Sequence, residues 1–166
     1  MSHRALPGMV VTSARNDLPV LLSIPHAGRD YPGWLMAAAW SGRPSLEPLE
    51  DPLVDRLAWR ALAAGFGAVI ATCPRAAIDC NRAEDELDPI LIDDTPSAER
   101  GSRARGGLGL IPSRTARHGH LWRSRIDREE VERRLDEISA LAPDVLVRVT
   151  GFTFGISHEP SGLVQI

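Results

Sequence analysis

In the first half of the chain, two short hydrophobic runs flank a segment whose hydrophobic residues recur at helical spacing. The segment LPVLLSIP at 18–25 predicts a buried strand because it is short and ends at a proline, and GAVIAT at 67–72 predicts a second strand. Between them, Asp51 fits a helix N-cap, Pro52 fits the first helical position and Gly65 fits the helix end. A strand, a helix and a strand in this order predict two parallel strands of an α/β sheet. The apolar face of the predicted helix consists of Leu53, Val54, Leu57, Ala61 and Leu62.

The second half of the chain is more polar and holds one clear helix. Residues 83–118 are rich in polar residues and glycine, which is typical of a functional or mobile loop, and we interpret the glycines at 106–109 as loop flexibility. Asp127 and Glu130 have the spacing of a capping box, and the helix that follows buries a stripe formed by Val131, Leu135 and Ile138. Three shorter segments complete the prediction: a helix at 34–41, a strand at 108–112 and a last strand at 144–150.

The composition indicates one globular domain that covers residues 1–166. Hydrophobic residues make up 43% of the chain and charged residues 25%, which is ordinary for a soluble domain and excludes long disorder. All nineteen basic residues are arginine, which pairs well with phosphate, but the net charge of −3 argues against a broad basic surface. We therefore attribute most of the arginines to coding bias and expect no nucleic-acid partner.

The sequence also bears on the location of the protein. No run approaches the roughly 18 consecutive apolar residues that cross a bilayer, so we expect no membrane partner. The first residues lack the apolar core of a signal peptide, which predicts a cytoplasmic protein. Cys73 and Cys80 are expected to be free thiols, because a disulfide framework needs more cysteines and an exporting context. The sequence leaves the oligomeric state open.

Polar residues that could bind a ligand or take part in catalysis lie directly after the first predicted strand and before the predicted helix. His26, in Pro25-His26-Ala27-Gly28, lies where open α/β sheets bind ligands, and imidazole is a common zinc ligand. Gly28 allows a sharp turn and a close approach of a ligand to the backbone. A histidine that caps a turn is the structural alternative. Asp51 is explained equally well as a metal ligand and as a helix cap, whereas the helix dipole explains Asp55 better.

A second polar cluster, PRAAIDCNR at 74–82, follows the second predicted strand. It places Arg75, Asp79, Asn81 and Arg82 at the same end of the sheet as the histidine of the first cluster. Arginine binds a carboxylate bidentately and asparagine adds a directed donor, so this cluster fits a carboxylate ligand, with Asp79 holding one of the arginines in place. The structural alternative is a surface ion-pair network, which contributes little to stability.

In order and spacing, the segments SIPHAGRDYP, EDPLVD, PRAAIDCNRAEDELDP and GGLGLIPSR resemble the N-formylglutamate amidohydrolase family over roughly residues 18–138. The resemblance implies an α/β phosphorylase/hydrolase-like fold with three α/β/α layers and a mixed, partly parallel sheet. It also implies an enzyme in which a metal-activated water cleaves the carbon–nitrogen amide bond of an N-formyl or N-acyl amino acid such as N-formylglutamate. The implied partner is therefore a small-molecule substrate.

The same resemblance implies a zinc site. His26 and Asp51 would be metal ligands, with Glu50 as the alternative to Asp51. The third ligand and the general base are expected from a later part of the family pattern. Residues 139–166 depart from that pattern, so we expect a truncated or divergent family member whose metal site is incomplete and whose sheet lacks strands. His158 follows a serine and is a candidate replacement ligand, although its surroundings do not match.

The resemblance further implies how the substrate is held. Asn81 and Arg82 would bind a substrate carboxylate. Arg75 would stabilise the oxyanion that forms from the scissile carbonyl, or bind a second carboxylate. The alternative hypothesis is a catalytically inactive family member that binds carboxylate ligands through these residues without a metal.

Overall fold

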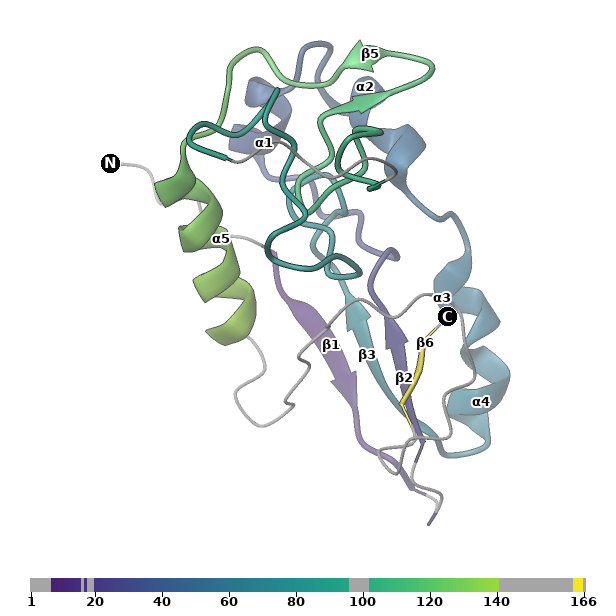
Figure 1. Ribbon diagram of the computed structural model, residues 1–166. Coiled ribbons are helices and arrows are strands. Elements are labelled where there is room, and N and C mark those ends of the chain that lie inside the picture. Colours follow the sequence, from purple (N-terminus) through teal and green to yellow (C-terminus); the bar gives the residue numbers. More distant parts are fainter. Residues whose placement is uncertain (1–6, 16, 18–19, 96–101, 141–162, 166) are drawn as a thin grey trace.

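The strands of the computed structural model form a mixed sheet (Figure 1). The structure describes residues 7–15, 17, 20–95, 102–140 and 163–165. Strand β2 lies in the sheet between β3 and β6 and runs parallel to both, whereas β1 pairs antiparallel with β3 at the edge. The bounds of the four strands are β1 Met9–Thr12, β2 Leu21–Ile24, β3 Gly67–Ala71 and β6 Leu163–Gln165.

Short helices and one longer helix surround this sheet, and a small hairpin extends from the loops. Among the described residues, no helix has the length and apolar character needed to cross a membrane. The helices are α1 Gly33–Ala38, α2 Arg43–Leu46, the 3-10 helix η1 Glu47–Leu49, α3 Val54–Leu57, α4 Trp59–Ala63 and α5 Arg128–Ala140; the hairpin consists of β4 Arg114–Thr115 and β5 Gly119–His120.

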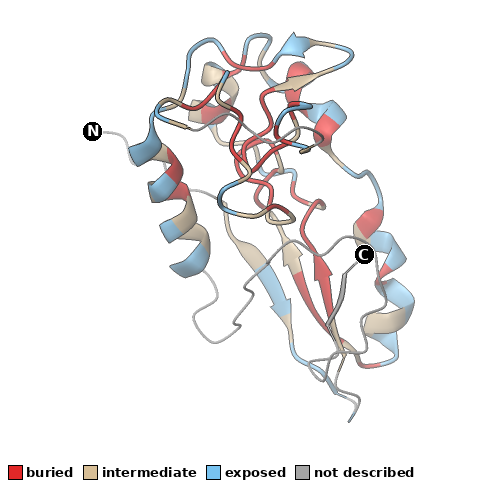
Figure 2. Ribbon diagram, in the orientation of Figure 1, coloured by how far each residue is buried: buried red, intermediate tan, exposed pale blue. Residues whose placement is uncertain are grey.

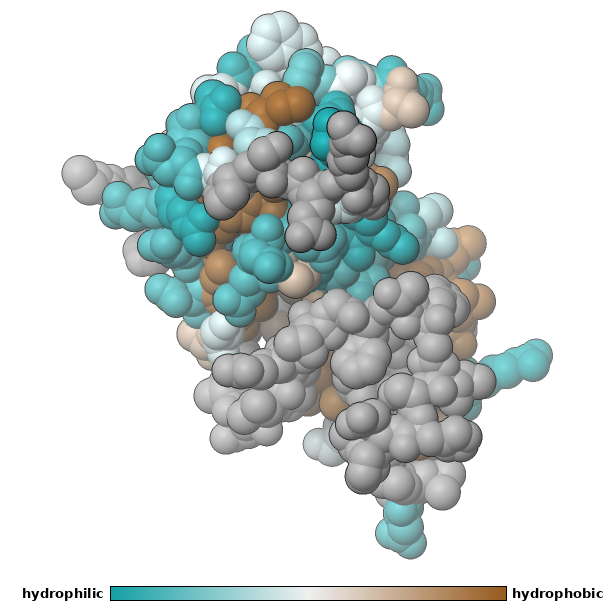
Figure 3. Space-filling view, in the orientation of Figure 1, coloured by the Kyte–Doolittle hydropathy of each residue, from teal (hydrophilic) through white to brown (hydrophobic). Residues whose placement is uncertain are grey.

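Helices α3 and α4 pack on one face of the sheet. The β2–β3 register places Leu22 opposite Ala68, so their side chains point to the same face, where they meet Val54 and Ala58 of the helical segment. All four residues are buried. The outer side of the segment is apolar at Leu57, and Figure 3 shows hydrophobic residues at the surface beside α3. The strand–helix–strand unit is therefore held by burial of one helix face against the sheet.

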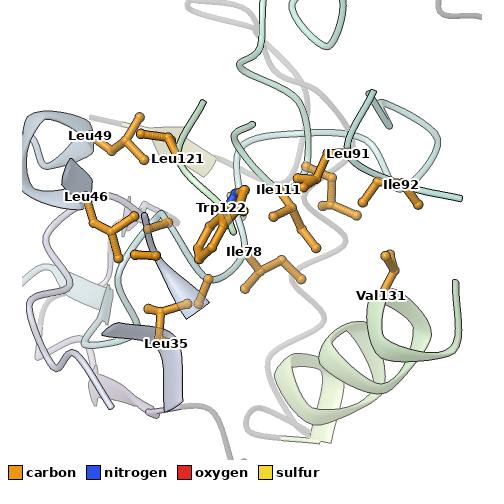
Figure 4. Close-up of a cluster of buried hydrophobic side chains, with 14 of the residues drawn as sticks. Leu35, Leu46, Leu49, Ile78, Leu91, Ile92, Ile111, Leu121, Trp122 and Val131 are labelled. Atoms are coloured by element: carbon orange, nitrogen blue, oxygen red, sulfur yellow. The ribbon is translucent and has the colours of Figure 1, made fainter. Parts of the chain in front are cut away.

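A larger core lies beyond the carboxyl ends of β2 and β3, among loops rather than strands. Figure 2 shows that buried residues are concentrated in these loops. Figure 4 shows the side chains of this core, to which α1, α2, η1 and α5 contribute. Trp122 lies within it, and its indole N–H donates to the carbonyl of Pro112 at 2.6 Å. This packing holds the loops that follow the two parallel strands in fixed positions.

Most of the predicted elements are present. Strand β2 lies within 18–25 and β3 within 67–72, and their parallel pairing is confirmed. Helix α1 corresponds to 34–41, and α5 to the helix after Asp127, whose carboxylate caps the N–H of Glu130. The carboxylate of Glu130 binds arginines of α5, and Val131 is buried as predicted. The mixed sheet with helices that the sequence predicts is therefore confirmed.

Two predicted elements differ from the structure, and a third lies outside it. The strand expected at 108–112 is wrong: this segment is irregular, and Leu110 and Ile111 are apolar because they are buried in the loop core. The helix expected from Asp51 is divided into α3 and α4, and it begins only after Leu53, which has a left-handed backbone conformation with φ of 72°. The strand expected at 144–150 lies outside the described residues.

Candidate active site

His26 lies between two carboxylates just beyond the end of β2. Its Nδ1 is 2.8 Å from Asp51 Oδ2, and its Nε2 is 2.8 Å from Asp79 Oδ1. Asp51 precedes α3, and Asp79 follows β3. Because β2 and β3 are parallel neighbours, the segments that follow them meet at one edge of the sheet. Asp51 does not cap α3 with its side chain, so the helix-cap explanation of this residue does not apply to α3.

Asp79 is the most enclosed member of the group, with 0% of its side chain exposed. Its Oδ1 also accepts the N–H of Asn81 at 2.9 Å, and its Oδ2 accepts Arg75 Nε at 2.8 Å. Burial alone would raise the pKa of Asp79. The hydrogen bond with His26 and the charges of Arg75, His26 and Arg82 outweigh burial and lower the pKa below its ordinary value. Asp79 is therefore a buried carboxylate anion.

This anion fixes the orientation of the histidine ring. If the single N–H of a neutral imidazole is on Nε2, the carboxylate of Asp79 accepts it. The lone pair of Nδ1 then faces the carboxylate oxygen of Asp51. Two electron-rich atoms at 2.8 Å need a proton between them or a cation that both of them bind. A carboxylate on one ring nitrogen and a free lone pair on the other is the arrangement of a metal-binding histidine with its orienting partner.

Gly28 brings the turns after the two strands into contact. A Cβ at this position would lie 1.9 Å from the carbonyl oxygen of Cys73, so only glycine allows the two backbones to approach this closely. The N–H of Asp30 donates to Thr72 O at 3.1 Å across the same contact. The sequence predicted a close approach at Gly28, but the approaching group is the protein backbone rather than a ligand. The contact sets the distance between His26 and the segment that carries Asp79.

The predicted carboxylate-binding residues lie around the same aspartate. Arg82 is 7% exposed, its Nε donates to Leu108 O at 3.0 Å, and its NH1 donates to Asn81 O. Its NH2 and the Oδ1 of Asn81 are buried atoms without a hydrogen-bond partner among the residues that the structure describes. Burial lowers the pKa of the Arg82 guanidinium, although the charge of Asp79 opposes this effect. Unpaired buried polar atoms are costly in a folded chain, and a bound ligand is one way to satisfy them.

Two of the glycines at 106–109 allow close packing of the segment whose Leu108 carbonyl binds Arg82. Gly107 has φ of 90°, and a Cβ there would lie 2.3 Å from Arg114 Cγ. A Cβ at Gly109 would lie 2.3 Å from Glu86 O. The close packing that results presents carbonyl oxygens to the site, one of which accepts Arg82 Nε. Close packing therefore gives Gly107 and Gly109 a reason that the sequence did not show.

Glu50, the alternative ligand, is directed away from His26. Its carboxylate accepts the hydroxyl of Tyr31 at 2.8 Å and lies 3.5 Å from Arg29 Nε. Arg29 also reaches Asp55, with 3.6 Å between NH2 and Oδ1. These contacts support the loop that carries the metal-ligand candidate, and they give both Glu50 and Asp55 structural partners.

The thiols next to the site are unreactive. Cys73 and Cys80 are both free, as predicted. Burial raises the pKa of Cys73 well above its ordinary value, and burial together with the neighbouring Asp79 charge raises the pKa of Cys80 to about 12. Both groups stay protonated near neutral pH and are poor nucleophiles.

The chain is similar to known proteins of one family. The sequence profile of the N-formylglutamate amidohydrolase family matches residues 18–139. The chain belongs to this family. It is also similar to a crystal structure of N-formylglutamate amidohydrolase from Ralstonia eutropha JMP134 at 2.00 Å resolution, with 30% sequence identity and a TM-score of 0.68. The match covers 83% of this chain and 49% of the other, so this chain spans about half the length of that relative. No curated protein matches.

In this member of the N-formylglutamate amidohydrolase family, the site residues that the sequence predicted lie around Asp79. The sequence predicted for Asp79 only that it holds an arginine in place. His26 and Asp51 are in contact, and Arg75, Asn81 and Arg82 surround Asp79. The sequence placed Asp79 beside an arginine, which is confirmed, but not beside the histidine, 53 positions earlier in the chain. The shared position after adjacent parallel strands was the only signal for that contact. The third-ligand candidate, His158, lies outside the described residues.

Proposed function

We propose that this chain hydrolyses the carbon–nitrogen amide bond of an N-formyl or N-acyl amino acid such as N-formylglutamate, using a metal-activated water in a three-layer α/β/α fold. The observation that carries the proposal is the position of His26, held by the buried Asp79 on one ring nitrogen and facing Asp51 on the other. Membership of the N-formylglutamate amidohydrolase family supports an N-formyl or N-acyl amino acid as the substrate. A metabolic reaction of this kind is consistent with the expected cytoplasmic location.

The metal proposed is zinc, and His26 and Asp51 would hold it. A ring nitrogen and a carboxylate oxygen are common zinc ligands, and the 2.8 Å between them needs a cation or a proton. When bound, zinc lowers the pKa of a coordinated water toward 7 and polarises a carbonyl. Asp79 keeps the ring in the orientation that such a ligand requires. Catalytic zinc sites have three protein ligands, and His26 and Asp51 would supply two of them.

The arginine cluster would bind and polarise the substrate. Among the described residues, Arg82 NH2 is an unpaired donor that could bind a substrate carboxylate, and Asn81 Oδ1 is an unpaired acceptor that could bind the amide N–H of an N-acyl amino acid. Arg75 uses its Nε for Asp79 and is 13% exposed, so the rest of its guanidinium can meet an oxyanion at the carbonyl being attacked. Both arginines pair with Oδ2 of Asp79, which would fix the substrate groups that they bind relative to His26.

The test is a deformylase assay of the purified protein with N-formyl-L-glutamate and added zinc. We expect release of formate and glutamate, one zinc per chain by metal analysis, and loss of both on His26→Ala. His120→Ala is the matched control, because His120 is an exposed histidine of β5 that should leave activity and zinc unchanged. A folded protein that binds zinc but releases no formate would overturn the proposal.

A second candidate function is carboxylate binding without catalysis. Within the residues that the structure describes, no three His, Cys, Asp or Glu side chains form a group that could hold a metal ion. The unpaired atoms of Asn81 and Arg82 would still bind an N-acyl amino acid. Calorimetric binding of N-formyl-L-glutamate in the presence of a chelator, abolished by Arg82→Met and without turnover in zinc, would favour this function.

A further inference from the structure

Arg134 is a buried arginine on α5, outside the group of residues assigned to the site. It is 3% exposed. Its Nε donates to Glu130 Oε1 at 2.9 Å, and its NH1 donates to the carbonyl of Ala77 at 2.7 Å. Its guanidinium carbon lies 4.9 Å from the ring centroid of Trp34 in α1. One guanidinium therefore joins α5, α1 and the turn that follows β3.

The carbonyl that Arg134 holds belongs to the turn that carries the site. Ala77 is fully buried, and its N–H donates to Pro74 O at 2.8 Å, which closes the turn. Arg75 precedes Ala77 by two positions, and Asp79 follows it by two. A hydrogen bond at this carbonyl therefore restrains the backbone between the residue proposed to stabilise the oxyanion and the residue that orients His26.

Arg134 is itself held by its own helix. The Asp127 carboxylate caps the N–H of Glu130 at 2.8 Å. The Glu130 carboxylate then accepts hydrogen bonds from both Arg133 and Arg134. Ion pairs in a protein interior are often replaced by apolar residues without loss of stability. Stability alone therefore does not account for a buried arginine here, whereas a directed hydrogen bond to a particular carbonyl does.

We propose that Arg134 is a positioning residue for the candidate active site, which fixes the Ala77 carbonyl and thereby places Asp79 against His26. This inference rests on the proposed function for its kinetic part only. Arg82 has anchors besides Asp79, the carbonyls of Leu108 and Asn81, so the carboxylate-binding group depends only in part on Arg134. Loss of Arg134 should therefore impair the reacting centre more than substrate binding.

The experiment compares three variants of the purified protein. Arg134→Met removes the guanidinium and keeps an unbranched apolar side chain, and Arg134→Lys keeps one donor near Ala77. Arg128→Met is the matched control, because Arg128 is a half-exposed arginine of the same helix that pairs with Glu132. Circular dichroism and thermal unfolding establish that each variant folds.

The first measurement is NMR of the histidine ring N–H groups in protein labelled with ¹⁵N-histidine, with His26→Ala used for assignment. We expect Arg134→Met to shift the His26 resonances and to speed exchange of its ring N–H at least tenfold, with Arg134→Lys intermediate. The second measurement is hydrolysis of N-formyl-L-glutamate, for which kcat should fall at least tenfold in Arg134→Met while KM stays within twofold. Arg128→Met should change neither result.

Unchanged His26 resonances in folded Arg134→Met would overturn the inference, even if kcat fell, because the effect would then be general loosening of the fold. If Arg134→Met does not fold, the same comparison of Arg134→Lys with Arg128→Met decides. If the wild-type protein shows no hydrolysis, the proposed function fails, and the NMR comparison still decides the role of Arg134.

Discussion

Replacement of Asp79 by asparagine tests whether the site is organised around a buried charge. The side chain has no exposed surface, and its two oxygens accept hydrogen bonds from His26, Arg75 and the N–H of Asn81. An asparagine has the same shape, but one of its two ends carries an NH2 group. Whichever way the amide is turned, a donor then faces a donor, and the charge that compensates the buried Arg82 is lost.

The magnitude follows from these contacts. Removal of one partner from a buried ion pair costs about 3–5 kcal/mol, because the remaining charge stays buried and uncompensated. With roughly 2–4 °C of melting temperature per kcal/mol in a domain of this size, Asp79→Asn should lower the melting temperature by about 6–20 °C. The effect is a large fraction of the 5–15 kcal/mol that typically stabilises a domain.

Urea unfolding, followed by the fluorescence of the four tryptophans, measures the loss of unfolding free energy. Asp93→Asn is the control, because Asp93 forms an ion pair with Arg125 in which both side chains are half exposed, and such a pair contributes at most about 1 kcal/mol. Equal shifts of the urea midpoint for the two variants would refute the reasoning, since burial would then make no difference to the aspartate.

Three further predictions concern stability and its dependence on pH. Burial opposes ionisation of Glu130, but its arginine partners on α5 lower its pKa, so its stabilising effect is present above the ordinary value of about 4.3 and is lost as pH falls through the lowered pKa. The difference in unfolding free energy between wild type and Glu130→Gln should therefore shrink below about pH 4, and a difference that grew on acidification would contradict this sign. Gly28→Ala should lower the urea midpoint by an amount equal to about 1–3 kcal/mol, because the new Cβ overlaps the Cys73 carbonyl; an unchanged midpoint would show that the contact is not close. Leu53→Gly should leave stability unchanged or raise it by up to about 1 kcal/mol, because it relieves a left-handed conformation, whereas Leu57→Gly within α3 should cost about 1 kcal/mol; equal losses would argue against the strain.

The elements that the sequence predicted correctly are those fixed by local patterns. The apolar runs that became β2 and β3, and the capped amphipathic helix that became α5, are recognisable because burial and capping act within a few residues. The order of these elements was enough to place His26 and the segment with Asp79 at one edge of the sheet. Sequence order does not state which atoms touch there, and the contact between the two residues needed the structure.

The parts that could not be predicted depend on contacts between distant segments. Asp51 has the signature of a helix cap, and only the left-handed conformation of Leu53 shows that the helix begins later and that the carboxylate is directed to His26. The glycines at 106–109 have the composition of a flexible loop, yet two of them are required for close packing against Arg114 and Glu86. Composition reports that a residue is small, but not what lies beside it.

The two carboxylates beside His26 differ greatly in exposure, with 52% of the Asp51 side chain exposed and none of the Asp79 side chain. A proton or an ion bound at Nδ1 of His26 could therefore exchange with solvent past the exposed side chain of Asp51. Nε2 faces the buried Asp79 and has no such route. If zinc binds His26 and Asp51 as proposed, a chelator should remove it from the folded protein without any opening of the core.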